Sequence, residues 1–172
     1  MRLSKEERNF FISNIHEMIE TEQICEMNQY IQHGNTTTFI HCMVVAYYSY
    51  ITALRLPLKY DMKSLIRGAM LHDFYLYDWH IPDKNQKLHG FRHPGFALRN
   101  ARKHFKLTPI EEDIIEKHMW PLTLRKAPIY KESILVCMID KYCSLTETFY
   151  LSAMPKELKQ VMRMIQNQGL VC

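Results

Sequence analysis

The chain has 172 residues, 47% of them hydrophobic, which is enough to form the core of one compact domain. Its 22 basic and 18 acidic residues are interspersed and form no block of like charge, which argues against binding of DNA or RNA. The five cysteines are an odd number without a C-x-x-C pair, so they predict neither a disulfide framework nor a zinc ribbon and fit a reducing compartment.

The N-terminal stretch MRLSKEERNFF contains acidic residues and lacks the apolar segment of an export signal. No residue between Glu26 and Arg55 carries a formal charge, but only residues 39–54 within this stretch are mostly apolar. That segment is short for a membrane span and contains a histidine. We therefore expect a buried helix there, no association with a membrane and a cytoplasmic location.

Apolar residues spaced three and four apart, with few glycines and prolines, predict an all-α bundle of about six to eight helices without significant β-sheet. Ser4 and Glu7 form a capping box at the start of the first helix, Asp61 can cap the third, and Thr108 opens the fifth. The polar segment 81–95 is rich in helix breakers and predicts a loop. The expected helices cover approximately residues 4–32, 37–54, 61–72, 95–105, 108–120, 130–151 and 155–170.

Six residues that can bind a divalent metal lie within or at the ends of these helices. Several of them interrupt apolar runs, where a buried histidine or carboxylate is costly unless it has a partner. A lone histidine in such a position is more often a hydrogen-bonded core residue, but the recurrence of the pattern favours a metal site. The six candidates are His41, His72, Asp73, His93, His118 and Asp140.

The spacing of these candidates suits a helical bundle. Successive candidates are separated by 31, 20, 25 and 22 residues, with His72 and Asp73 taken together, and each interval is about one helix and a turn. Antiparallel helices joined in this way can bring their ligands to one side of a bundle. Nitrogen and carboxylate ligands indicate one or two divalent transition metals, such as Fe, Mn, Zn, Ni or Co, rather than Ca.

The order H…HD…H…H…D, from about Asn35 to Phe149, resembles the HD-domain superfamily of metal-dependent phosphohydrolases. The similarity lies in five segments: HCMVVA, GAMLHD, HPGFAL, IIEKH and CMIDKYCSLTE. The resemblance implies one HD domain over residues 1–172, with an N-terminal helix (1–32), a metal-binding helical core (35–150) and a C-terminal helix (155–170). Leu76 replaces the lysine of the members that act on cyclic dinucleotides, and the G-Y-P signature is missing, so hydrolysis of cyclic-di-GMP is not expected.

The resemblance also implies the chemistry. His41, His72, Asp73 and Asp140 would hold one ion, and His93 and His118 the second, with Asp73 bridging the two. A metal-bound hydroxide would then hydrolyse a phosphoester or phosphoanhydride without a protein nucleophile. Asp73 and His72 are accordingly the predicted catalytic residues.

The expected partner is a small phosphorylated substrate, such as a nucleotide, bound by a monomer or a homodimer. Lys141, His89, Arg125 and Trp79 are candidate substrate contacts, although ordinary surface charge explains Arg125 equally well. Either His89 or His93 could be the ligand in this segment. The helix breakers Gly90 and Pro94 argue against one continuous helix that would place both histidines on the same face.

Two other functions remain open on the sequence alone. Some HD-fold proteins use a diiron centre with the same ligand types for oxygenation. The fold can also serve as a regulatory module without turnover, although the presence of every expected ligand type speaks against that alternative.

Overall fold

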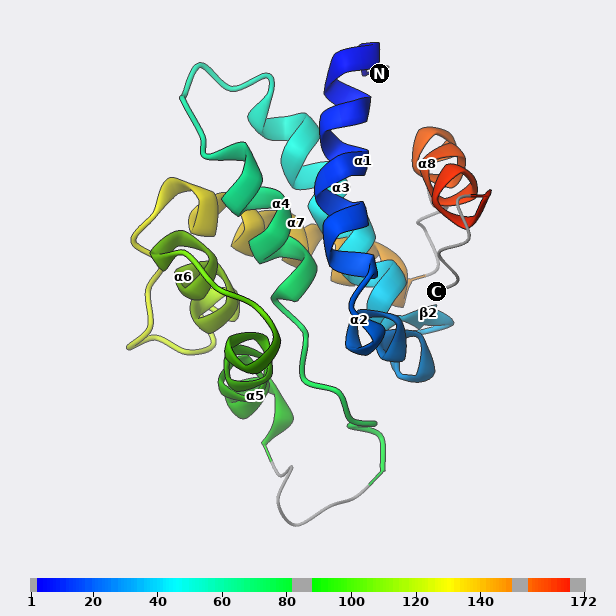
Figure 1. The fold of residues 1–172 in the computed structure, drawn as a ribbon. Helices are drawn as coiled ribbons and strands as arrows, with labels where there is room; N and C mark the ends of the chain where they lie inside the picture. Colours follow the sequence, from blue (N-terminus) through cyan, green and yellow to red (C-terminus); the bar gives the residue numbers. More distant parts are fainter. Residues whose placement is uncertain (1–2, 82–87, 150–154, 168–172) are drawn as a thin grey trace.

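The computed structural model describes residues 3–81, 88–149 and 155–167 (Figure 1). Within these ranges the chain forms eight α-helices, one short 3-10 helix and one antiparallel pair of very short strands. The all-α prediction is therefore confirmed. The helices are α1 (Lys5–Ile19), α2 (Glu22–Glu26), α3 (Thr38–Ala53), α4 (Met62–Leu71), α5 (His89–His104), α6 (Pro109–Lys117), α7 (Lys131–Thr148) and α8 (Lys156–Asn167); the other elements are η1 (Met27–Gln29), β1 (Ile31–His33) and β2 (Thr36–Thr37).

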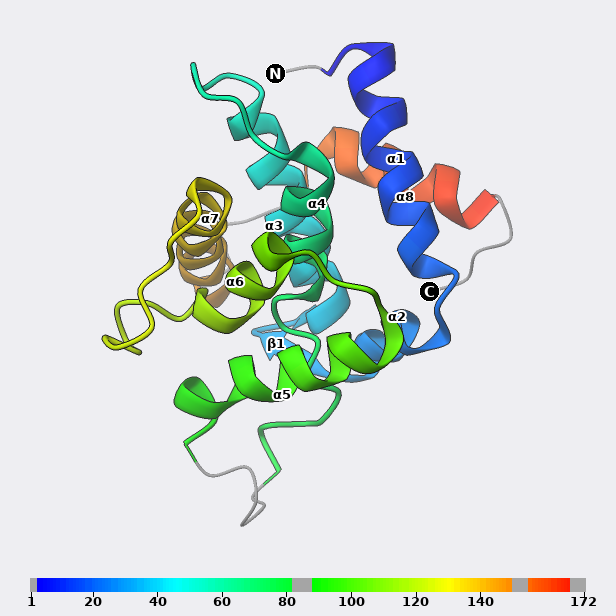
Figure 2. The same ribbon diagram turned by 60° about the vertical axis from the view of Figure 1, so that its left-hand side comes forward.

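Helix α4 lies at the centre of the bundle and contacts α1, α3, α5, α6 and α7. Helix α7 packs against α3 and α6 on one side of the bundle, and α5 lies beneath α6 (Figure 2). Helix α8 lies beside α1, away from α5 (Figures 1 and 2). None of the described helices has both the length and the apolar run that crossing a membrane requires.

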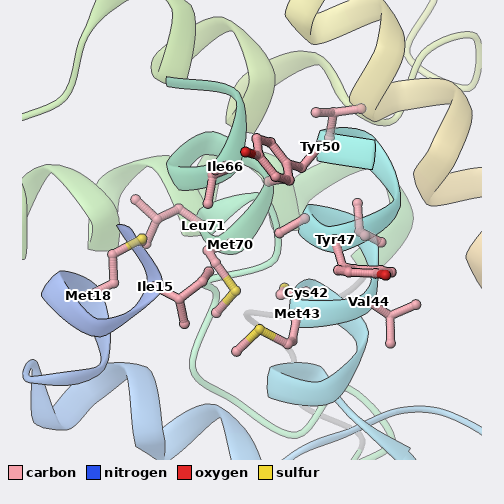
Figure 3. Close-up of a cluster of buried hydrophobic side chains, with 14 of the residues drawn as sticks. Ile15, Met18, Cys42, Met43, Val44, Tyr47, Tyr50, Ile66, Met70 and Leu71 are labelled. Atoms are coloured by element: carbon pink, nitrogen blue, oxygen red, sulfur yellow. The ribbon is translucent and has the colours of Figure 1, made fainter. Parts of the chain in front are cut away.

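The mostly apolar segment 39–54 forms the core helix α3, as its composition predicts. The side chain of Thr37 caps α3 by accepting a hydrogen bond from the Ile40 amide at 3.3 Å. Most residues of α3 are buried, and they pack against α1 and α4 around Met43 and Met70 (Figure 3). Burial on nearly all sides explains why this helix carries no formal charge.

The first helix ends earlier than the sequence indicates. The expected helix over 4–32 stops at Ile19, and Thr21 adopts an extended conformation before α2 begins. The chain then passes through η1 into β1, which pairs with β2. The prediction of a continuous N-terminal helix was therefore wrong, because the chain leaves the helical conformation at Thr21 and residues 31–37 form the paired short strands instead.

The helix expected over 95–105 begins earlier, at His89. It passes through Gly90 and includes Pro94 as its sixth residue, although a proline at that position removes one backbone hydrogen bond of the helix. The predicted loop over 81–95 is therefore shorter at its C-terminal end, and its residues 82–87 lie outside the described part of the chain. The last residues of the expected tail helix, 168–170, also fall outside it.

Gly68 allows α4 to lie close to α6. A Cβ atom at this position would be 2.5 Å from Cδ1 of Ile114 and 3.1 Å from its Cβ. Both distances are shorter than ordinary carbon contacts of about 3.5–4.0 Å. The small residue thus sets the spacing of two helices whose C-terminal ends carry His72 and His118.

We expect Gly68→Ala to destabilise the protein by about 1–3 kcal/mol, as in an overpacked core. At a helix position with free space around the Cβ atom, the same change would stabilise the protein by about 0.5–1 kcal/mol. Urea unfolding measures the difference, and Ile114→Val, which removes the Cδ1 atom, should recover part of the loss in the double variant. An increase in stability for Gly68→Ala alone would contradict this account of the packing.

Candidate metal centre

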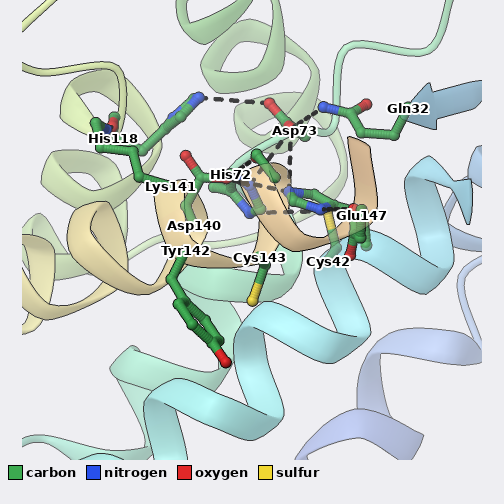
Figure 4. Close-up of polar contacts among 12 residues, drawn as sticks. Gln32, Cys42, His72, Asp73, His118, Asp140, Lys141, Tyr142, Cys143 and Glu147 are labelled. Carbon is green, nitrogen blue, oxygen red and sulfur yellow. Dashed lines mark hydrogen bonds and ion pairs between the residues drawn. The ribbon is translucent and has the colours of Figure 1, made fainter. Parts of the chain in front are cut away.

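The six candidate ligands come from five helices and meet in the interior. His41 lies in α3, His72 is the residue that ends α4, and Asp73 follows it directly. His93 lies in the first turns of α5, His118 ends α6, and Asp140 lies in α7. All six are buried, with exposed fractions of 5% or less. Figure 4 shows how side chains from these separate elements gather around Asp73.

The six residues divide into two groups of three. His41, His72 and Asp140 form one group, and Asp73, His93 and His118 form the other. In each group the potential ligand atoms all lie within 4.8 Å of one another. The structure thus brings together every residue that the sequence singles out as a ligand, and it resolves the choice between the two neighbouring histidines in favour of His93, because His89 belongs to neither group.

Asp73 faces both groups with different oxygen atoms. Its Oδ1 lies 3.1 Å from Nε2 of His93 and 3.4 Å from Nε2 of His118. Its Oδ2 lies 3.4 Å from Nε2 of His72 and 3.9 Å from Nε2 of His41. Asp140 completes the first group, with Oδ1 at 3.1 Å from His41 Nε2 and 3.6 Å from His72 Nε2.

The outer nitrogen of each histidine ring has an acceptor. Nδ1 of His72 lies 2.6 Å from the Ala69 carbonyl oxygen, that of His93 3.0 Å from the His89 carbonyl, and that of His118 2.9 Å from the Ile115 carbonyl. Nδ1 of His41 lies 2.8 Å from Oε2 of Glu147. Carbonyl and carboxylate oxygens only accept, so each Nδ1 carries a hydrogen, and each ring turns its Nε2 toward the carboxylates.

This arrangement of acceptors fits a metal ion. His93 Nε2 and His118 Nε2 are only 2.7 Å apart, and two lone pairs at that distance repel unless a proton or a cation lies between them. His72 Nε2 and Asp73 Oδ1 have no hydrogen-bond partner among the described residues. Histidine nitrogens and carboxylate oxygens are the donors that divalent transition metals prefer, and a second hydrogen bond on each histidine is typical of metal ligands.

The pKa values of the site residues also indicate that the site needs positive charge. Burial lowers the pKa of His41, but hydrogen bonds to Asp140 and Glu147 outweigh this effect and raise it to about 10. Burial raises the pKa of Asp73, yet the neighbouring His72 and His93 hold it well below its usual range. The buried carboxylates of Asp73 and Asp140 therefore require positive charge beside them, which comes either from protonated histidines or from a bound cation.

Two residues around the ligands were missed by the sequence reasoning. Gln32, on β1, donates from Nε2 to Asp73 Oδ2 at 2.5 Å. Its amide oxygen accepts from Thr38 Oγ1 at 3.2 Å and from the hydroxyl of Tyr75, which fixes the orientation of the amide. No local signal reveals Gln32. Glu147 does have one, because it follows Asp140 by two helical turns and so shares its face of α7.

A cavity of about 710 Å³ opens onto the two groups. Asp73, His93, His118 and Asp140 line it, whereas His41 and His72 are fully buried beneath. The rest of its lining comes from Gln32, Trp79, His89, Gly90, Met119, Pro121, Leu122, Lys141 and Ser144.

The structure brings three of the four predicted substrate contacts to this cavity. Trp79 and His89 stack with ring centroids 5.0 Å apart, and the hydroxyl of Tyr77 lies 2.9 Å from Nδ1 of His89. Lys141 donates from Nζ to the His118 carbonyl at 2.7 Å, so its ammonium is already engaged. Arg125 is exposed and does not line the cavity.

His80 is exposed. It lies 3.0 Å from the carboxylate of Asp78 and does not line the cavity.

These features define a mostly α-helical protein with two adjacent buried groups of histidine and aspartate, each of which could hold a metal ion. A scan against protein-family models, a search of curated proteins and a search of solved structures gave no match.

Glu147→Ala should weaken metal binding by about 10–100-fold, the usual effect of removing the hydrogen-bond partner of a ligating histidine. Glu147→Gln should cost less, because the amide oxygen still accepts from His41. Competition with a chromophoric chelator measures the affinity. Glu132→Gln is the matched control, since Glu132 is buried on the same helix but accepts from the Asp61 amide instead. Unchanged affinity in Glu147→Ala would show that this contact does not support a ligand.

Proposed function

We propose that this protein is a metal-dependent phosphohydrolase of the HD-domain type, acting on a small phosphorylated metabolite. The observation that carries the proposal is the position of Asp73, whose two carboxylate oxygens face two buried groups of ligands at the floor of a cavity. This is the arrangement that a carboxylate bridging two metal ions requires. The H…HD…H…H…D order of the sequence supports the same assignment.

The first group, His41, His72 and Asp140, would hold one ion, and the second group, Asp73, His93 and His118, would hold the other. A pair of such ions activates water, whose pKa falls from about 15.7 to about 7, and neutralises the oxygens of a phosphoryl group. The chain itself contributes the fixed ligand geometry. Hydrogen bonds from Gln32 to Asp73 and between His41 and Glu147 hold the ligands in place.

The remainder of the cavity indicates the kind of substrate. Trp79, the stacked His89, Met119, Pro121 and Leu122 give it an apolar and partly aromatic wall. Lys141 is the single cationic side chain among the described lining residues, and its ammonium is occupied. A polyphosphate would therefore meet few cationic partners beyond the ions. A monophosphate ester with a flat, uncharged group, such as a nucleoside or an aryl group, suits this wall better.

The central test combines metal content with hydrolysis. Elemental analysis of tag-free protein purified without added metal should find up to two Fe, Mn, Zn, Ni or Co ions per chain. Phosphate release from a panel of phosphoesters should stop after chelation and return when metal is added. Asp73→Asn should lose bound metal and activity together, whereas Asp78→Asn, which changes an acidic residue outside the cavity lining, should keep both.

Full hydrolysis by Asp73→Asn would overturn the proposal. Absence of phosphate release from metal-loaded protein would also overturn it. In that case, oxygen consumption by the iron-loaded protein would favour the oxygenase alternative, and absence of any turnover would favour a regulatory module.

Trp79→Ala should raise KM for a nucleoside monophosphate by on the order of tenfold, since stacking of a base on an aromatic ring contributes about 1–3 kcal/mol. The value of kcat should change little, because Trp79 is not a ligand. Trp120→Ala is the control, since Trp120 is the other tryptophan and does not line the cavity. Equal effects of the two substitutions on KM would contradict a substrate-facing role for Trp79.

A further inference from the structure

Helix α7 carries a continuous apolar stripe on its outer face. Five large side chains of this stripe are between 47% and 65% exposed. They are separated by four, four, three and four residues, so they follow one side of the helix along nearly its whole length. The stripe consists of Ile134, Met138, Tyr142, Leu145 and Phe149.

The stripe lies opposite the metal centre. The inner face of α7 buries Asp140 and Glu147 and packs against α3, α4 and α6. Figure 2 shows α7 at one edge of the bundle, with these helices on one side of it. In Figure 4, Tyr142 points away from Asp140 and the cluster.

This outer face is also uncharged. After Lys131, every exposed residue of α7 is apolar or threonine, and Phe149, which caps the helix, continues the pattern. Glu132, Asp140 and Glu147 are buried, and the ammonium of Lys141 is bonded to the His118 carbonyl. An exposed helix of a monomer normally presents charged and polar residues on its outer side. The composition of the stripe is that of a covered face.

The area of the stripe is close to that of a dimer interface. From their exposed fractions, the five side chains present roughly 650 Å² of surface, at or above the ~300–600 Å² of the largest patch on a typical monomer. A standard interface buries about 800 Å² on each partner. Leu124 and Ile129, which are 77% and 71% exposed in the segment before α7, add further apolar surface.

We propose that the stripe pairs with the same stripe of a second copy of this chain, through antiparallel contact of the two α7 helices. Tyr142 stands at its midpoint, with two large apolar residues on either side, so a two-fold axis at Tyr142 sets Ile134 against Phe149 of the other copy and Met138 against Leu145. Such an interface is self-complementary, as two-fold symmetry requires. With no charge on the face, pairing brings no like charges together.

This inference is independent of the proposed catalytic activity, because it concerns the face of α7 that turns away from the cavity. It does bear on the site. The helix that would be held between two copies is the one that presents Asp140 and Glu147, so dimer formation would restrict its movement.

Sedimentation equilibrium of the full chain tests the proposal. The wild-type protein should have twice the monomer mass of 20.6 kDa at micromolar concentration. The double variant Met138→Glu, Leu145→Glu should dissociate at least tenfold more readily and keep its helical circular dichroism, because both positions are exposed in the monomer. Leu58→Glu, at another exposed leucine, is the control and should remain dimeric. A monomeric wild-type protein, or an unchanged double variant, would overturn the proposal.

Cysteine cross-linking tests the orientation. Tyr142→Cys should form a disulfide between copies on mild oxidation, above the background of the wild-type cysteines. Ile134→Cys should not, because eight residues of helix separate it from the axis by about 12 Å, and therefore from its counterpart by about twice that distance. Cross-linking of both variants would indicate parallel helices and overturn the antiparallel arrangement, whereas cross-linking of neither would overturn pairing at Tyr142.

Discussion

The buried charge of Asp73 and Asp140 is the constraint on which the rest of this structure depends. Carboxylates in the interior of a helical bundle are costly unless positive charge and hydrogen bonds surround them. Here the surrounding groups come from α3, α4, α5, α6 and α7, so none of these helices can shift without leaving a buried charge exposed to apolar side chains. The candidate metal centre therefore links the central helices of the fold, in addition to any chemistry it supports.

Helix ends orient two of the ligands by the same device. His72 and His118 are the residues that end α4 and α6, and each directs Nδ1 to the carbonyl three residues earlier. These carbonyls belong to the last turn, where the helix itself leaves acceptors without partners. A histidine at this position satisfies one of them and at the same time turns its other nitrogen inward. Helices α4 and α6 approach closely at Gly68, and the ring centroids of His72 and His118 lie 4.9 Å apart.

Helix α7 serves two environments at once. Its inner face supplies a carboxylate to the ligand groups and another to His41, while its outer face is an uncharged apolar stripe. Helices of soluble monomers usually divide into an apolar inner face and a polar outer one. Helix α7 departs from this division, because acidic residues of the candidate site lie among the buried residues of its inner face and its outer face is apolar.

The sequence by itself determined the helical class, the caps of α1, α4 and α6, and the six candidate ligands, because each rests on a local signal: apolar periodicity, capping residues, or a polar residue in an apolar run. Only the tertiary structure decided between His89 and His93, ended the first helix at Ile19 and excluded Arg125 from the cavity. It also revealed Gln32 and Glu147, which meet Asp73 and His41 across 41 and 106 residues. Contacts of that range depend on how the helices pack, which the sequence around Gln32 does not show, and the spacing of Glu147 from Asp140 places it on a face of α7 without identifying its partner.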